Sequence, residues 1–84
     1  MKIEVTEKHI QNGHRGLGSE CPIALAIRER VPDTHVFVTH SSITVGSLRF
    51  PNNYSVFTHN YDTHREVYPF SFELFLTEET SCQN

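Results

Sequence analysis

The sequence has little of three things: uninterrupted apolar length, positive charge and cysteine. No apolar run approaches the roughly 18 residues that a membrane-spanning helix needs, so we expect no such helix and no membrane partner. Residues 1–5 also lack the long apolar region of a secretory signal peptide. The two cysteines, Cys21 and Cys82, are too few for a disulfide framework. These absences predict a cytoplasmic protein with reduced thiols.

Positive charge is scarce, because seven Lys and Arg stand against ten Asp and Glu, for a formal net charge of −3. A general nucleic-acid binder normally needs an extended basic face, so the charge argues against a nucleic-acid partner. The length of 84 residues predicts one small domain over the whole chain, with a polar tail from about residue 78.

The stretch 21–31 predicts the main helix of the protein. Pro22 suits a first helical turn, where its missing N–H would be unpaired anyway, and good helix formers follow it. The helix should end before Pro32. One face is apolar and consists of Ile23, Ala24, Ile27 and Val31. Because Leu25 and Ala26 extend this surface, the helix must be covered on more than one side, and we place it against a sheet.

Alternating apolar residues predict strands at 2–5 and from residue 70 onward, and β-branched and aromatic residues predict another at 36–39. The last strand alternates most cleanly, with one face made of Phe70, Phe72, Leu74 and Leu76. Residues 43–50 predict a further strand whose alternation changes phase at Gly46-Ser47, where we expect a β-bulge or a bend.

Two lesser helices are expected. Thr6 can cap a short helix that ends at Asn12, before Gly13. Residues 54–62 are ambiguous, because their aromatic residues have helical spacing while Val56 and Thr58 are poor helix formers, and we choose a helix. The predicted fold is therefore α+β: a mostly antiparallel sheet of about four strands packed against one main helix, with one or two lesser helices.

Metal binding and catalysis find little support in the sequence. The six histidines form pairs five residues apart: His9 and His14, His35 and His40, His59 and His64. Five residues turn a helix by about 140° and lead to opposite faces of a strand, so neither geometry aims both rings at one ion. We expect no metal and no cofactor.

The sequence contains the residue types of a hydrolytic triad: His40, Ser41 or Ser42, and Asp62. No nucleophile-elbow motif accompanies them.

Cys21 allows two interpretations. At the start of a helix its thiol pKa can be lowered, which would make it reactive and the protein a cysteine-dependent enzyme. Free cysteine is also commonly buried as a small hydrophobe, and we favour this second interpretation. We therefore expect no catalytic residues.

Two sets of residues are binding candidates. The loop before the main helix combines a cation with backbone freedom and helix N–H groups, which suits an anion such as phosphate; its candidate residues are Arg15, Gly16, Gly18 and Ser19. The glycines would alternatively only let a tight loop reach the helix. The second set is aromatic and favours a protein interface: Tyr54, Tyr61, Tyr68 and Phe75. These rings would alternatively close the rim of a small core.

The chain also resembles a group of short phage and bacterial proteins without an assigned activity. The residues that carry the resemblance are Val5-Thr6, His9-Ile10, Gly13, Arg15-Gly16, Cys21-Pro22-Ile23-Ala24-Leu25-Ala26, Val67, Pro69-Phe70 and Phe72-Glu73-Leu74. The run from Cys21 to Ala26 is the most specific part. The resemblance implies a phage context, hence the cytoplasm of a host cell, and no catalytic residues.

Two function hypotheses follow. The first is a non-enzymatic, phage-encoded accessory binding protein that inhibits a host protein or a defence system by protein–protein interaction, with self-association into a homo-oligomer as a variant. The second is a protein that sequesters a small anionic ligand, such as a nucleotide defence signal, at the loop 15–19. A local positive charge would suffice for this, whatever the net charge.

Overall fold

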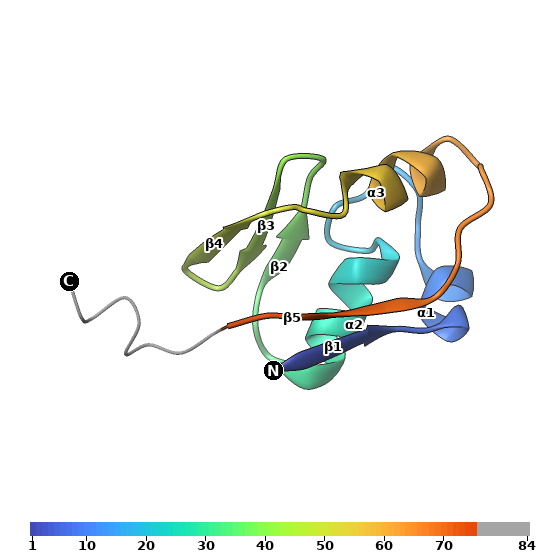
Figure 1. Ribbon diagram of the computed structural model, residues 1–84. Coiled ribbons are helices and arrows are strands. Elements are labelled where there is room, and N and C mark those ends of the chain that lie inside the picture. The colour runs from blue at the N-terminus through green and yellow to red at the C-terminus, as the bar shows by residue number, and fades with distance from the viewer. Residues whose placement is uncertain (76–84) are drawn as a thin grey trace.

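The computed structural model describes residues 1–75. In chain order the elements are β1 (Lys2–Val5), α1 (Glu7–Asn12), α2 (Pro22–Arg30), β2 (Val36–Val38), β3 (Ser42–Val45), β4 (Leu48–Pro51), α3 (Ser55–Asp62) and β5 (Phe70–Glu73). Figure 1 shows their arrangement. The architecture is α+β with antiparallel sheets, which confirms the predicted class. The predictions for Leu76, for Cys82 and for the polar tail lie outside the described residues.

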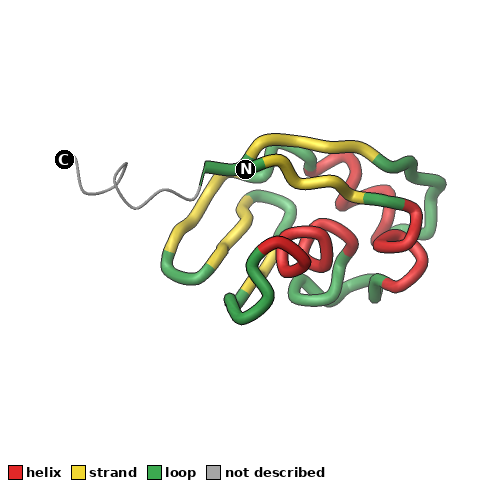
Figure 2. The backbone as a smooth tube through the Cα atoms, turned by 90° about the horizontal axis from the view of Figure 1, so that it is seen from below, coloured by secondary structure: helices red, strands yellow, loops and turns green. Residues whose placement is uncertain are grey.

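The strands form two sheets rather than the one sheet of about four strands that we predicted. β1 pairs with β5, with Lys2 opposite Glu73 and Val5 opposite Phe70, so the first strand lies beside the last. Figure 2 shows this pair from below. The other sheet has the order β2-β3-β4. Within the described residues no helix is both long and apolar enough to cross a membrane.

The expected bulge at Gly46-Ser47 is a hairpin turn, so the prediction of one strand over 43–50 was wrong. Gly46 has φ of 61°, which suits the first central position of a two-residue type II′ turn. Because the chain reverses here, Val45 lies directly opposite Leu48, and both side chains belong to the same face. The change of phase in the sequence is the signature of this reversal.

α2 fills the space between the two sheets, because it contacts β1 of one sheet and β2 of the other. Its residues Ile23, Ala24 and Ile27 are fully buried. The prediction of one dominant helix was wrong, because α2 and α3 have nearly the same length, nine and eight residues. The expected helices at the positions of α1 and α3 are confirmed. The core on which α2 packs is built from Ile3, Val5, Val36, Val38, Ile43, Val45, Phe72 and Leu74.

Candidate functional site

A cavity of about 220 Å³ opens where the loop before α2 meets the end of β2 and the helix α3. We call it the β2 pocket. It is lined by Gly16, Leu17, Gly18, Cys21, Phe37, Val38, Thr39, His40, Thr58 and Asp62. The loop, the strand and the helix contribute residues that are far apart in the sequence, so only the tertiary structure brings them together.

Gly18 holds the loop against the free edge of β2. The Val38 N–H donates a hydrogen bond to the Gly18 carbonyl at 3.0 Å, and the His14 N–H closes the loop onto the Glu20 carbonyl at 2.9 Å. A Cβ at Gly18 would lie 2.5 Å from the Val38 carbonyl oxygen and 3.0 Å from the Phe37 ring. Only glycine permits this close approach. Gly18 therefore serves the close packing of the loop, which is the alternative to anion binding that we had left open for the loop glycines.

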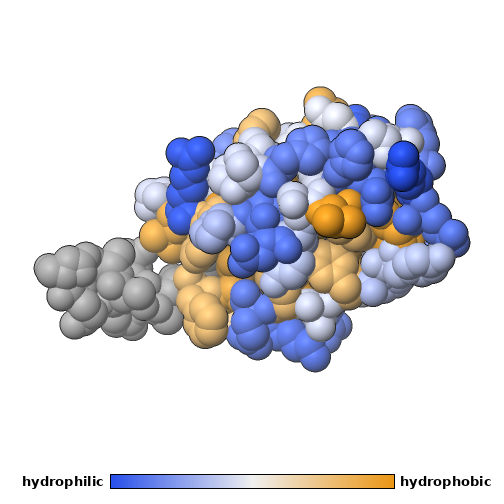
Figure 3. All heavy atoms as spheres, turned by 45° about the horizontal axis from the view of Figure 1, so that its top comes forward, coloured by the Kyte–Doolittle hydropathy of each residue, from blue (hydrophilic) through white to orange (hydrophobic). Residues whose placement is uncertain are grey.

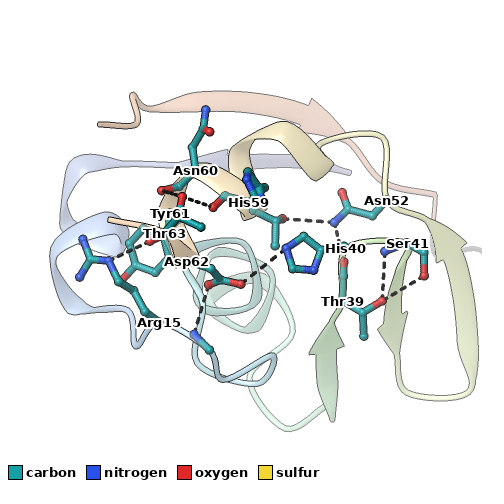
Figure 4. Close-up of polar contacts among 12 residues, drawn as sticks. Arg15, Thr39, His40, Ser41, Asn52, His59, Asn60, Tyr61, Asp62 and Thr63 are labelled. Atoms are coloured by element: carbon teal, nitrogen blue, oxygen red, sulfur yellow. Dashed lines mark hydrogen bonds and ion pairs between the residues drawn. The ribbon is translucent and has the colours of Figure 1, made fainter. Parts of the chain in front are cut away.

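The carboxylate of Asp62 binds the Gly16 N–H, a backbone group of the loop in which we expected an anion to bind. Its Oδ1 accepts the Gly16 N–H at 3.1 Å. Its Oδ2 lies 3.8 Å from Nε2 of His40. In the view of Figure 4, Asp62 lies between Arg15 on one side and His40 on the other. The loop thus binds a carboxylate of its own chain, and Gly16, at φ of 80°, is in the left-handed region that presents its N–H this way.

Arg15 does not line the pocket but fastens the loop to α3. Its Nε donates to the Tyr61 carbonyl at 2.8 Å, and its guanidinium lies 4.7 Å from the centre of the Tyr61 ring. Ser19 is half-buried and also lies outside the pocket lining. Of the four predicted loop residues, only Gly16 and Gly18 line the cavity. The geometry therefore separates the cation of this loop from its pocket.

Cys21 lies in the wall of the pocket as a buried N-cap of α2. Burial raises the pKa of its thiol from the ordinary value of 9.0. The backbone N–H groups of Ala24 and Ile23 act against this, while the negative charge of Asp62 adds to it. Burial has the largest effect and the pKa is raised, so the thiol stays protonated at neutral pH. This is the environment of the small buried hydrophobe that we favoured.

Asn52, which the sequence pattern did not single out, ties the β2–β3 turn to α3. Its Nδ2 donates to the Thr39 carbonyl at 2.7 Å and to Oγ1 of Thr58 at 3.3 Å. Its Oδ1 accepts the Tyr54 N–H at 2.8 Å. Figure 4 shows Asn52 beside His40. The sequence offered only an asparagine between a predicted strand and a predicted helix, with four hydrogen-bonding positions to fill; its burial is a finding of the structure.

Of the residues considered for catalysis, His40 and Asp62 lie together, with Nε2 and Oδ2 3.8 Å apart, but the two serines have other partners. Oγ1 of Thr39 accepts the N–H groups of Ser41 and Ser42, at 3.3 and 3.0 Å, and lies 3.1 Å from Oγ of Ser42. In the described part of the chain no hydrogen bond joins either serine hydroxyl to His40. These contacts make a turn rather than a triad.

Histidines from different sequence pairs approach each other, but residues 1–75 contain no group of three or more His, Cys, Asp or Glu suited to a metal ion. The rings of His40 and His59 have centres 6.0 Å apart.

His9 is buried and has a structural role. Its Nδ1 accepts the Thr6 N–H at 3.0 Å, and its Nε2 lies 3.0 Å from Oε1 of Glu29. Because Nδ1 accepts, Nε2 carries the proton and donates to Glu29.

The four predicted interface aromatics divide into two pairs. The expectation that Tyr61 offers an exposed ring was wrong, because it is 2% exposed and its hydroxyl donates to the Ile10 carbonyl at 3.2 Å. Tyr54 packs on the rings of Phe70 and Phe72. These two close the core, which is the alternative that we had left open, whereas Tyr68 and Phe75 are exposed.

Sequence reasoning missed two exposed apolar side chains at the β2 pocket, Leu17 at 53% and Phe37 at 43%. Phe37 alternates with the buried Val36 and Val38 and so lies on the outer face of β2. Because all three residues are apolar, the sequence did not show which face is exposed. On the face that Figure 3 shows, apolar atoms are exposed in several places between polar side chains.

No model of a known protein family matches the chain, and neither the curated proteins nor the solved structures gave a match.

Proposed function

We propose that this chain is a non-enzymatic binding protein whose β2 pocket receives a side chain of a protein partner. The observation that carries the proposal is the pair Leu17 and Phe37, which are both exposed and both line the same cavity. Protein interfaces concentrate their binding energy where a side chain of one partner fills a pocket that apolar contacts shield from water. A pocket with an exposed apolar rim has that form.

The size of the pocket favours a side chain over a whole small molecule. Sites for drug-sized ligands and cofactors typically measure about 300–1,000 Å³. The β2 pocket, at about 220 Å³, is smaller than this range. The Gly16 N–H is bound to Asp62, and Nε of Arg15 is bound to the Tyr61 carbonyl, so two of the donors expected for a nucleotide phosphate already have partners within the chain. We therefore place protein binding before nucleotide sequestration.

The chemistry of the pocket supports binding rather than catalysis. The thiol of Cys21 has a raised pKa because it is buried, so little thiolate is present at neutral pH. The resemblance to phage proteins supports a host protein, for example a component of a defence system, as the partner. In this proposal the protein acts in the host cytoplasm by occupying a surface of that component.

Affinity capture from bacterial cells that express the tagged protein tests the proposal. Three baits are compared: wild type, the double variant Leu17→Ser and Phe37→Ser, and the control Val56→Ser. Val56 is 73% exposed on α3 and does not line the pocket, so it matches the loss of exposed apolar surface elsewhere. Equal thermal unfolding of the baits establishes that each is folded.

We expect a stoichiometric partner with wild type and with Val56→Ser, and its loss with the double variant. A partner that the double variant retains, or no stoichiometric partner with wild type, would contradict the proposal. Light scattering on the purified protein decides the homo-oligomer variant, since a monomeric mass excludes a second copy as the occupant of the pocket.

A further inference from the structure

The β2 pocket has an acidic wall beneath its apolar rim. Asp62 lines the cavity, and its side chain is 25% exposed. Within the part of the chain that the structure describes, only Oδ1 of its carboxylate accepts a hydrogen bond, from the Gly16 N–H. Oδ2 lies 3.8 Å from His40, beyond hydrogen-bond distance, so within residues 1–75 it keeps its acceptor capacity. The pocket therefore contains a charged acceptor that a ligand can use.

Among residues 1–75, no lysine or arginine lines the pocket to neutralise this charge at every pH. Arg15 lies outside the lining, with its Nε on the Tyr61 carbonyl and its guanidinium over the Tyr61 ring. His40 is the one titratable base in the lining, and its side chain is more than half exposed to solvent. The negative charge of Asp62 also acts on the thiol of Cys21, another residue of the lining, whose pKa it helps to raise.

We propose that the occupant of the β2 pocket is an arginine side chain of the protein partner, whose guanidinium donates to Oδ2 of Asp62 while its methylene stem lies between Leu17 and Phe37. This inference rests on the proposed function. It follows from complementarity: an arginine has an apolar stem and a charged, donor-only head, and the pocket has an apolar rim and a charged acceptor inside.

The shape of the arginine side chain adds a second reason to choose it. Its methylene stem can cover the Phe37 ring while its head reaches Asp62, and the planar guanidinium matches a carboxylate better than the point charge of lysine. An anionic group would instead meet the carboxylate of Asp62 and would have to displace it from the Gly16 N–H. The charge of the pocket thus distinguishes a basic occupant from an anionic one.

Amide chemical shifts of the ¹⁵N-labelled full chain test the inference without knowledge of the partner. The probes are N-acetyl-arginine amide, its neutral isostere N-acetyl-citrulline amide, and inorganic phosphate. We expect the arginine probe to shift the amides of Gly16, Leu17, Gly18 and Asp62 in a saturable way, with a dissociation constant on the order of 1 mM. The citrulline probe and phosphate should leave these amides unshifted.

Asp62→Asn is the matched variant, because its amide oxygen can still accept the Gly16 N–H while the charge is lost. We expect it to abolish the arginine-dependent shifts and to lower the affinity for a captured partner by at least about tenfold. Equal shifts with citrulline, shifts that survive Asp62→Asn, saturable binding of phosphate, or no saturable arginine binding would each overturn the inference.

The two proposals fail in different ways. A partner that needs Leu17 and Phe37 but tolerates Asp62→Asn overturns the arginine anchor and leaves the binding function in place. Arginine binding that depends on Asp62, without any stoichiometric partner from cells, overturns the binding function while the chemistry of the pocket stands.

Discussion

Two regions of this protein are held together by different forces. Around α2, apolar side chains from both sheets exclude water, and Ile23 and Ile27 are fully buried. Around the β2 pocket, the loop, the β2–β3 turn and α3 are joined largely by hydrogen bonds of Arg15, Asn52 and Asp62. Apolar burial is non-directional and determines which elements pack, whereas hydrogen bonds fix distance and angle. The first region makes the fold, and the second positions the site.

This difference predicts that substitutions in the core change the free energy of unfolding most. Substitutions around the pocket should change its geometry more than the stability of the chain. The four predictions below test this contrast, in order of decreasing effect.

Ile27→Ala should give the largest loss of stability, about 3 kcal/mol in the free energy of unfolding, because it removes buried methylene groups and leaves a cavity in the core. Urea unfolding measures it. Leu25→Ala, on the same helix at a half-buried position, is the control and should cost less. Equal costs for the two variants would mean that α2 is not packed between the sheets as described.

Asn52→Ala should cost about 2 kcal/mol, because it leaves the Thr39 carbonyl and the Tyr54 N–H without their partner in a buried site. Asn53→Ala changes the exposed neighbour and should stay within about 0.5 kcal/mol of wild type. Thermal and urea unfolding of both variants measure the difference. If Asn53→Ala were as costly as Asn52→Ala, the polar network would not be what holds the turn to α3.

Gly18→Ala should cost about 1.5 kcal/mol and displace the loop from β2, because the new Cβ meets the Val38 carbonyl. Gly16→Ala is its counterpart: it strains a backbone at φ of 80° for about 1 kcal/mol, but it meets no atom within 4 Å. In a Cys82→Ser background, a thiol reagent should therefore label Cys21 faster in Gly18→Ala than in Gly16→Ala. Equal labelling rates would contradict the close approach of loop and strand.

The smallest effect concerns pH. Burial raises the pKa of Cys21 above its ordinary value of 9.0, so the folded chain keeps a proton that the unfolded chain releases. Stability should therefore be unaffected by Cys21 below pH 9.0 and should fall as the pH rises through the folded-state pKa. Burial also raises the pKa of Tyr61 from 10.0, which acts in the same direction at higher pH.

Urea unfolding between pH 8 and pH 10, in the Cys82→Ser background, measures this dependence about the ordinary thiol pKa of 9.0. Removing the thiol by Cys21→Ala should flatten the profile in this range while lowering the stability at all pH values through lost packing. An unchanged slope in Cys21→Ala would show that the thiol is accessible to water in the folded chain.

Most of the local structure was accessible from the sequence. Pro22 and the apolar face that follows it identified α2, and the alternation at 70–74 identified β5. The error at Gly46 has a physical reason: a bulge and a two-residue reversal both change the phase of an alternating pattern, and the sequence alone does not distinguish them. The same ambiguity led us to expect too few strands, whereas the division into two sheets depends on long-range pairing of β1 with β5.

The sequence by itself determined the α+β class, the positions of the helices and the buried face of α2, because the periods of helices and strands are local properties of the chain. Only the tertiary structure decided that Leu17, Phe37 and Asp62 share one pocket, and that Tyr61 belongs to the core. These residues come from a loop, a strand and a helix. Their meeting depends on how the elements pack around α2, and no local pattern records that packing.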